Sequence, residues 1–384
     1  MIIFLSFVTI YGLGNLYVFF KVSNVLNAGL AGDICTGLFI LLMASSPVLV
    51  HMYSLRGSER PTRILSLTGY MWMAFVVIFS PAAALLDSYN FLAQQTGLLS
   101  GRAFNSITIP RSYTFFIPAF FSVTFSIYGY FEAKRLKIEK LTVKTSRLPA
   151  GTDRITLAQV SDLHLGIIAG DRTLNKVIRE IGNARPDLIV STGDLLDGAV
   201  THIDYMAQRL KDMSAPLGKF AVIGNHEFYG GLKHAVRFIQ DAGFILLRNR
   251  GVNVNGTINI AGVDDMGDMD EGLRENIKSA PEREMLAGLS PGIFTILLKH
   301  RSVVDRNSLG LFDLQLSGHT HKGQIFPINL LTWFIFEHHA GFRDLGKGSA
   351  LYVSRGAGTA GPPVRFLSPP ELTIIEIVNE GIFK

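Results

Sequence analysis

The stretch Ser161-Asp162-Leu163-His164-Leu165-Gly166 follows directly on an apolar run at 155–160. The run is typical of a buried strand, and its end carries a carboxylate and an imidazole two residues apart. Residues at i and i+2 of an extended segment point to the same side, so Asp162 and His164 can both reach one divalent metal ion. A D-x-H pattern by itself is also compatible with a solvated loop, and the rest of the chain has to decide.

Four further apolar runs in the C-terminal part of the chain end in polar clusters in the same way. They lie at 188–192, 220–223, 294–298 and 314–316. Together the five strand ends offer Asp162, His164, Asp194, Asn225, His226, His300, His319 and His321. Active sites of layered α/β proteins gather at the C-terminal ends of strands, so we expect these side chains to meet.

The donor set combines imidazole, carboxylate and one amide oxygen, without a thiolate. It favours Mn, Fe or Zn in a reactive site over a structural zinc site, which prefers Cys. An Asp after a glycine turn, as in Gly193-Asp194, suits a ligand shared by two metal ions. A metal pair of this kind can clamp the attacking and leaving oxygens in phosphoryl transfer.

The remaining patterns predict helices and a second sheet around this site. Apolar side chains recur at helical spacing in 172–183, 203–213 and, more weakly, 233–242. Further apolar runs at 257–263, 350–354 and 372–378 predict strands of a second sheet.

The N-terminal third differs sharply in composition. Residues 1–131 hold only six Lys or Arg and three Asp or Glu. Apolar segments at 1–20, 34–55, 64–87 and 112–131 each approach or exceed the roughly 20 residues that cross a bilayer. We therefore expect four transmembrane helices and a multi-pass integral membrane protein.

Basic residues set the expected orientation. The loop 56–63 contains three Arg, and the segment 132–147 contains six Lys or Arg against two Asp or Glu. Under the positive-inside rule both places, both termini and the C-terminal domain face the cytoplasm. We interpret 132–147 as a basic juxtamembrane connector, either lying on the lipid headgroups or forming an ordinary solvated linker.

The C-terminal part is nearly neutral. Residues 148–384 carry 24 Lys or Arg and 26 Asp or Glu, which disfavours nucleic acid as a partner. Cys35 is the single cysteine, so a disulfide within the chain is excluded, which fits a reducing compartment.

The motifs occur in a recognisable order. They are Asp162-Leu-His164, Gly193-Asp194-Leu-Leu-Asp197, Gly224-Asn225-His226-Glu227, His300 and Gly318-His319-Thr-His321. This set resembles the calcineurin-like metallophosphoesterase superfamily over roughly residues 155–378. The tail at 355–372 resembles its membrane-associated branch, which includes bacterial phosphodiesterases and enzymes similar to UDP-2,3-diacylglucosamine pyrophosphatase. The resemblance implies an α/β fold for 148–384, a four-layer α-β-β-α sandwich. The four-helix transmembrane region at 1–131, predicted from its apolar segments, precedes it.

The resemblance also implies a ligand for each metal. Asp162, His164 and His321 would hold the first ion, and Asp194 would bridge both. The second ion would be completed by Asn225, His300 and His319. The implied cofactors are thus two divalent ions, with Mn the first choice and Fe or Zn as alternatives.

Other residues near these motifs receive supporting or open roles. His226 would protonate the leaving oxygen or stabilise the transition-state charge. Asp197 and Glu227 would be structural or would support the ligands. Lys299, next to His300, is expected either to contact phosphate or to face solvent.

We therefore predict hydrolysis of a phosphodiester or pyrophosphate bond by metal-bound hydroxide, on a lipid-linked substrate at the bilayer, which in a bacterium is the inner membrane. The alternatives are a soluble substrate such as a cyclic nucleotide, or a catalytically weak membrane scaffold. An apolar segment at 326–336 follows His321 closely. It either dips into the membrane interface or lines an acyl groove, or it packs inside the domain.

Overall fold

The computed structural model describes residues 2–55, 59–100, 107–166, 170–197, 203–265 and 282–383. The chain forms two compact units. The helical unit comprises Met1–Glu132 with two short later segments, Ile325–Ile328 and Gly361–Leu367. The sandwich unit comprises Ala133–Gln324, Asn329–Ala360 and Ser368–Lys384.

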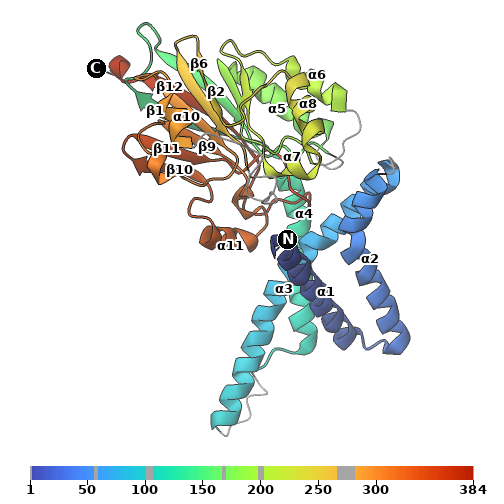
Figure 1. Ribbon diagram of the computed structural model, residues 1–384. Helices are drawn as coiled ribbons and strands as arrows, with labels where there is room; N and C mark the ends of the chain where they lie inside the picture. Colours follow the sequence, from blue (N-terminus) through green and yellow to red (C-terminus); the bar gives the residue numbers. More distant parts are fainter. Residues whose placement is uncertain are drawn as a thin grey trace. The chain divides into compact units, whose positions relative to one another are not determined.

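Four long helices make up most of the helical unit. They are α1 (Ile2–Leu26), α2 (Gly29–Leu55), α3 (Glu59–Ser100) and α4 (Arg111–Glu132) (Figure 1). Their candidate membrane spans are Leu5–Leu26, Gly29–Val50, Pro61–Gly97 and Arg111–Glu132. The four candidate spans agree with the hydropathy prediction, with bounds shifted by several residues. Arg56, one of the basic residues behind the predicted orientation, lies outside the described residues.

Polar side chains join three helices of this unit. Lys21 Nζ on α1 lies 2.5 Å from Asp87 Oδ1 on α3 and 3.0 Å from Thr114 Oγ1 on α4. Tyr17 donates a hydrogen bond of 2.5 Å to the other oxygen of Asp87. Ionisable groups inside apolar helices are expected to pair in this way, because an unpaired charge is costly in lipid.

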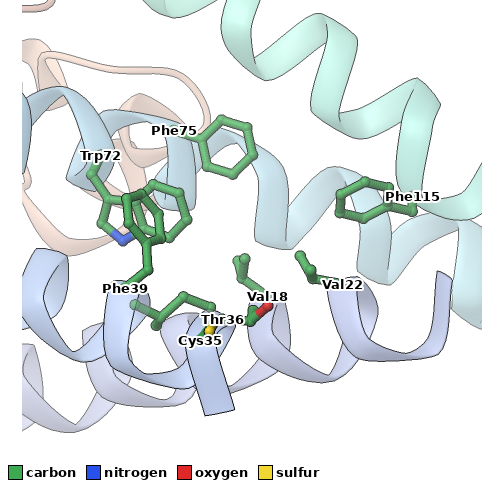
Figure 2. Close-up of a pocket in the computed structure, with 9 residues that line it drawn as sticks. Val18, Val22, Cys35, Thr36, Phe39, Trp72, Phe75 and Phe115 are labelled. Carbon is green, nitrogen blue, oxygen red and sulfur yellow. The ribbon is translucent and has the colours of Figure 1, made fainter. Parts of the chain in front are cut away.

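A pocket of about 400 Å³ lies among these helices (Figure 2). Aromatic rings of Phe39, Trp72 and Phe75 form part of its wall, together with Cys35. Apart from the thiol of Cys35, the wall offers no acid, base or metal ligand. The pocket is therefore an apolar cavity of the helical unit rather than a place for phosphate chemistry.

The sandwich unit contains two six-stranded mixed sheets (Figure 1). The first has the order β1 (Lys137–Thr145), β12 (Glu371–Asn379), β2 (Arg154–Val160), β3 (Leu188–Ser191), β4 (Lys219–Ala221) and β5 (Ile245–Leu246). The second has the order β10 (Gly341–Gly346), β11 (Ser349–Val353), β9 (Leu314–Ser317), β8 (Thr295–Lys299), β7 (Ile258–Val263) and β6 (Arg250–Val254). Strands β2 to β5 run parallel to one another, as do β7, β8, β9 and β11.

Alternate residues of each strand enter different cores, which defines the layers. Leu157 of β2 and Leu298 of β8 share one core between the two sheets. Ala158 of β2 enters a core beneath α5 (Asp171–Ala184), α6 (Ile203–Lys211) and α8 (Leu232–Asp241). Leu297 of β8 enters a core with Leu286 of α10 (Glu282–Ala287) on the outer face of the second sheet. The period-two alternation of strands thus produces a helix–sheet–sheet–helix sandwich and confirms the predicted fold class.

The segment assigned to a connector, 132–147, turns out to contain an edge strand. Lys137–Thr145 forms β1, which pairs in parallel with β12 along its whole length. Its partly buried Leu141 and Val143 pack against the core between the sheets, while its lysines lie outward. The lysines of this segment made a solvated connector the simpler prediction from sequence. On an edge strand, lysines disfavour pairing with strands of other chains.

The predicted helices at 172–183, 203–213 and 233–242 correspond to α5, α6 and α8. The predicted second sheet needs one correction. The runs 257–263 and 350–354 do lie in the second sheet as β7 and β11, but 372–378 lies in the first as β12. Periodicity identifies a strand but does not say which sheet receives it.

Candidate metal centre

The predicted strand-end residues converge, as expected from the sheet order. Asp162 and His164 follow β2, Asp194 follows β3, and His300 follows β8. His319 and His321 come after β9, whereas Asn225 and His226 begin the short helix α7 (Asn225–Tyr229). Among the residues that the structure describes, three groups have ligand atoms within 4.8 Å of one another: Asp162 with His164 and His321, His164 with Asp194 and His226, and Asp194 with His300 and His319.

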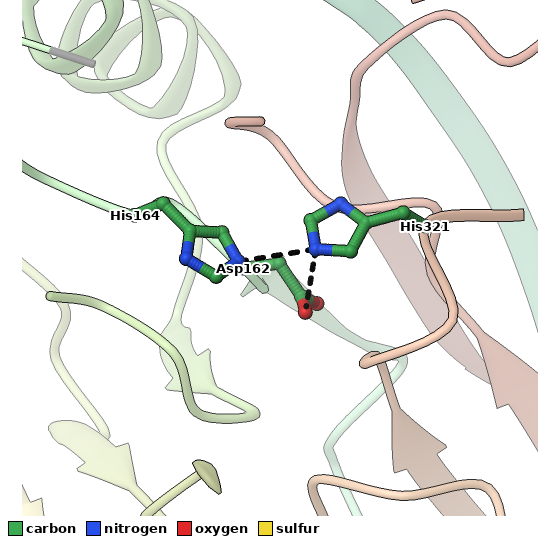
Figure 3. A group of neighbouring side chains, drawn as sticks. All are labelled: Asp162, His164 and His321. Carbon is green, nitrogen blue, oxygen red and sulfur yellow. Dashed lines mark hydrogen bonds and ion pairs between the residues drawn. The ribbon is translucent and has the colours of Figure 1, made fainter. Parts of the chain in front are cut away.

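The first group is buried and directs its polar atoms inward (Figure 3). His164 Nε2 lies 3.0 Å from His321 Nε2, and that nitrogen lies 3.4 Å from Asp162 Oδ1. The Asp162 carboxylate also accepts hydrogen bonds from the backbone N–H of His319 and from the Ser161 hydroxyl. Two imidazole nitrogens and a carboxylate oxygen therefore point at one small volume.

The second group has the same convergence around His300. Its Nε2 lies 3.1 Å from Asp194 Oδ2, from Asn225 Oδ1 and from His319 Nδ1. The other ring nitrogen, Nδ1, lies 2.8 Å from the Thr192 carbonyl oxygen and donates to it, which leaves Nε2 as the nitrogen for a ligand. An imidazole oriented through its far nitrogen is the usual arrangement behind a metal-binding histidine.

Asp194 connects the two groups. Its Oδ2 lies 3.1 Å from His300 Nε2 and 3.8 Å from His164 Nε2, while Oδ1 accepts from the backbone N–H of His226. One carboxylate thus faces both clusters.

His226 differs from the other histidines because a carboxylate partner holds it. Its Nδ1 lies 3.0 Å from Asp197 Oδ1, and its side chain stays 25% exposed whereas that of His164 is fully buried. Burial would lower the pKa of His226, but the hydrogen bond with Asp197 and the charge of Asp194 raise that pKa to about 9. A protonated, partly accessible imidazole oriented by a carboxylate is suited to proton donation.

Glu227 fixes the loop that carries Asp194. Its carboxylate accepts from the backbone N–H groups of Asp194 at 2.9 Å, Leu195 at 2.7 Å and Gly224 at 2.8 Å. Burial and the nearby charge of Asp194 raise the pKa of Glu227 to about 7. A side chain on Gly224 would collide with the Asp194 carboxylate, which explains the glycine at that position.

The backbone at the site is unusual. Asp162, His164, Asp194, His319 and His321 have φ of 50°, 47°, 52°, 70° and 47°. These values lie in the left-handed region that non-glycine residues rarely adopt, and such conformations concentrate at functional sites.

The electrostatics indicate a site built for cations. Burial raises the pKa of Asp162 to about 6 and lowers the pKa of His164 to about 4. Burial would also raise the pKa of Asp194, but His300 and neighbouring imidazoles hold it well below its usual range. In turn Asp194 raises the pKa of His300 to about 10. Protons on imidazoles thus supply the positive charge that the buried carboxylates require.

Metal ions bound between these side chains would supply the same positive charge in place of the imidazole protons. The carboxylate, imidazole and amide donors fit divalent metals of the Mn, Fe and Zn type.

The structure clarifies the residues that had open or supporting roles. Asp197 orients His226, and Glu227 holds the Asp194 loop, neither of which a motif alone can state. Lys299 Nζ lies 2.7 Å from Glu282 Oε2, so its charge is paired with that carboxylate. Gly356 lies in the tail at 355–372, and a side chain at this position would meet Asp162 and His321.

The apolar segment at 326–336 contains α11 (Ile328–Ile335). Of the two alternatives, packing inside the domain is wrong for this helix, because Trp333 is 58% and Phe334 77% exposed. Phe336, just after it, places its ring edge-on to His319 with 5.9 Å between centroids. An exposed apolar helix therefore lies next to the site in sequence, and the ring of the residue that follows the helix contacts His319.

With fold and site in place, comparison with known proteins is direct. Residues 155–323 match the family described as calcineurin-like phosphoesterase. A metallophosphoesterase of Aquifex aeolicus is 40% identical over 263 residues, covering 68% of this chain and 99% of that protein. The chain therefore belongs to the calcineurin-like metallophosphoesterases.

Two other relatives extend the comparison. A Bos taurus transmembrane protein with metallophosphoesterase domain is 27% identical, covering 94% of this chain and 85% of that protein. The Bacillus subtilis metallophosphoesterase YkuE is 33% identical over 262 residues, covering 65% of this chain and 87% of that protein. The first alignment includes most of the helical unit as well as the sandwich.

Proposed function

We propose that this metallophosphoesterase hydrolyses a phosphodiester or pyrophosphate bond of a lipid-linked substrate at the membrane. The observation that carries the proposal is the position of Asp194 between two buried His/Asp groups, with the His226–Asp197 pair beside it.

Seven side chains would hold two metal ions. Asp162, His164 and His321 serve the first, Asp194 serves both, and Asn225, His300 and His319 serve the second. Mn²⁺ is the first candidate, since the donors are nitrogen and oxygen without thiolate. When bound, such a pair neutralises phosphate charge and lowers the pKa of water near it.

The chain's own residues supply the rest of the chemistry. His226, oriented through Nδ1 by Asp197, offers Nε2 to the leaving oxygen and donates the proton that the departing group needs. Glu227 keeps Asp194 in place through backbone hydrogen bonds, so that the shared ligand needs no reorganisation during turnover.

A lipid-linked substrate is supported by two features of the chain. Four candidate spans keep the catalytic unit at a bilayer, and an apolar helix leads to Phe336 beside His319. A soluble phosphodiester such as a cyclic nucleotide needs neither feature. A catalytically weak scaffold needs no such complete set of converging ligands.

We further propose that residues 1–131 anchor the protein and that 148–384, joined by β1, form the catalytic part on the cytoplasmic side. Support comes from the basic residues at the loop 56–63 and after α4.

The test compares substrates with the full chain in detergent and added Mn²⁺. An acylated phosphodiester should be hydrolysed faster than a short-chain or aryl one at matched detergent concentration. Each buried CH₂ is worth about 0.8 kcal/mol, so a few methylenes are enough to separate them. Replacing both Trp333 and Phe334 by Ser should slow only the acylated substrate.

Asp194→Ala, measured in parallel, should abolish hydrolysis of both substrates. This control excludes a contaminating phosphodiesterase as the source of the activity. Equal turnover of long- and short-chain substrates would refute the lipid-linked substrate and leave the two-metal phosphoesterase in place. An inactive wild-type protein with metal bound would refute the enzymatic proposal.

A further inference from the structure

Helix α11 carries apolar side chains where a water-soluble domain would carry polar ones. Leu330, Leu331, Trp333, Phe334 and Ile335 are each more than half exposed. The one buried residue of the helix is Thr332. Helices of soluble domains normally show the reverse pattern, with polar side chains outward and an apolar stripe inward. Each of these large side chains would gain free energy from leaving water.

The chain enters α11 from the helical unit. Ile325–Ile328 belongs to that unit, and Ile325 packs there with Ala74 and Ile78 of α3. Phe326 lies 6.3 Å, ring to ring, from Phe366.

Phe366 in turn fixes the depth of this segment, because it stacks on Phe125 of α4 with 4.6 Å between centroids. Phe125 precedes the end of α4 at Glu132 by seven residues, about 10 Å at 1.5 Å per residue. Gly129, nearer that end, accepts a hydrogen bond of 3.0 Å from the Arg365 N–H. The segment leading into α11 is therefore attached within about two helical turns of the end of a candidate membrane span.

We infer that α11 lies in the membrane interface and inserts Trp333, Phe334 and their apolar neighbours into the leaflet at the C-terminal end of α4. The occupant of this apolar face is lipid, since the segment that leads into α11 packs on α3 and α4, which are both candidate membrane spans. Trp is the side chain most suited to that depth, with an apolar body and one polar N–H. The inference concerns where α11 lies and stands whether or not the substrate is a lipid.

The consequence for the site follows from Phe336. Its backbone N–H donates to the Thr332 carbonyl over 3.0 Å, so Phe336 is attached to the last turn of α11. Its ring in turn meets His319. With α11 in the leaflet, Phe336 connects the last turn of this helix to His319, a predicted metal ligand.

The single cysteine makes the test clean. In a Cys35→Ser background, Phe334→Cys is labelled with an environment-sensitive fluorophore, and Arg237→Cys on α8 serves as the control. Arg237 is a suitable control because its side chain is 78% exposed on a polar helix face of the sandwich unit. Each labelled full-length protein is placed, one chain per disc, in nanodiscs of phosphatidylethanolamine and phosphatidylglycerol, with ordinary or brominated acyl chains.

We expect a blue-shifted emission at position 334 that brominated lipid quenches at least twofold, and water-like, unquenched emission at position 237. Water-like emission at both positions would overturn the inference. So would a blue shift at 334 that brominated lipid does not quench, because that outcome places protein over α11. No turnover is measured, so failure here is distinct from failure of the proposed function.

Discussion

The His226 side chain pairs with the Asp197 carboxylate and is partly exposed, whereas the seven predicted ligands face one another. Removing its ring should therefore leave the metal groups intact and remove only the proton donor. We predict that His226→Ala retains both metals and slows turnover by roughly 10²–10⁴-fold. The loss should shrink for substrates whose leaving group is already a weak base, in a series of aryl phosphodiesters.

The matched control is His234→Ala, an exposed histidine of α8, which should be neutral. An equal loss with good and poor leaving groups would instead assign His226 to charge stabilisation or substrate positioning.

At the residue scale the sequence predicted which side chains converge but not the geometry in which they meet. All eight strand-end candidates converge, because parallel strands carry their C-terminal ends to one edge. The left-handed backbone at Asp162 or His319 has no signal in a single sequence, since neither residue type requires it. The hydrogen bond between His300 and the Thr192 carbonyl joins positions more than 100 residues apart in sequence and depends on the finished fold.

At the scale of elements, the loop after β11 supports the first metal group. A Cβ on Gly356 would lie 2.7 Å from Asp162 Cβ and 3.3 Å from His321 Nδ1. We predict that Gly356→Ala displaces these ligands and weakens binding of one of the two metals by roughly tenfold or more, the effect typical of disturbed ligand support. Metal titration of the stripped protein measures this.

Gly348→Ala is the matched control. Gly348 and Gly356 share a φ of 78°, so alanine meets the same backbone penalty at both, but no atom lies within 4 Å of a Cβ at Gly348. Similar metal affinities in the two variants would show that the loop does not support the ligands.

Helices and strands whose apolar residues repeat with one clear period were predicted from the sequence. Elements in which charged and apolar residues gave conflicting indications were not. Helices α5, α6 and α8 each bury one apolar stripe, which a single sequence displays. In strand β1 exposed residues, lysines among them, alternate with half-buried apolar residues. The high charge of this segment is also typical of a solvated linker, so the strand was not predicted. The place of β12 between β1 and β2 depends on pairing across more than 200 residues, which no local pattern encodes.

At the scale of the whole molecule, the predicted orientation is testable with reporters. Fusions after Lys384 and near Gly57 should report the cytoplasm, and an insertion near Gly97 the opposite side, because basic residues favour retention inside. A C-terminus found outside would reverse the assignment of the catalytic side and remove the expectation of a reducing compartment.

The proposed metal centre requires two metal ions that share Asp194, and the metal content of the protein measures this most directly. Elemental analysis of the purified, dialysed full chain should find two divalent ions per polypeptide. Asp194→Ala should lose more than one ion's share, because the carboxylate serves both groups, and should have no turnover. Two tightly bound ions and normal activity in Asp194→Ala would contradict the account.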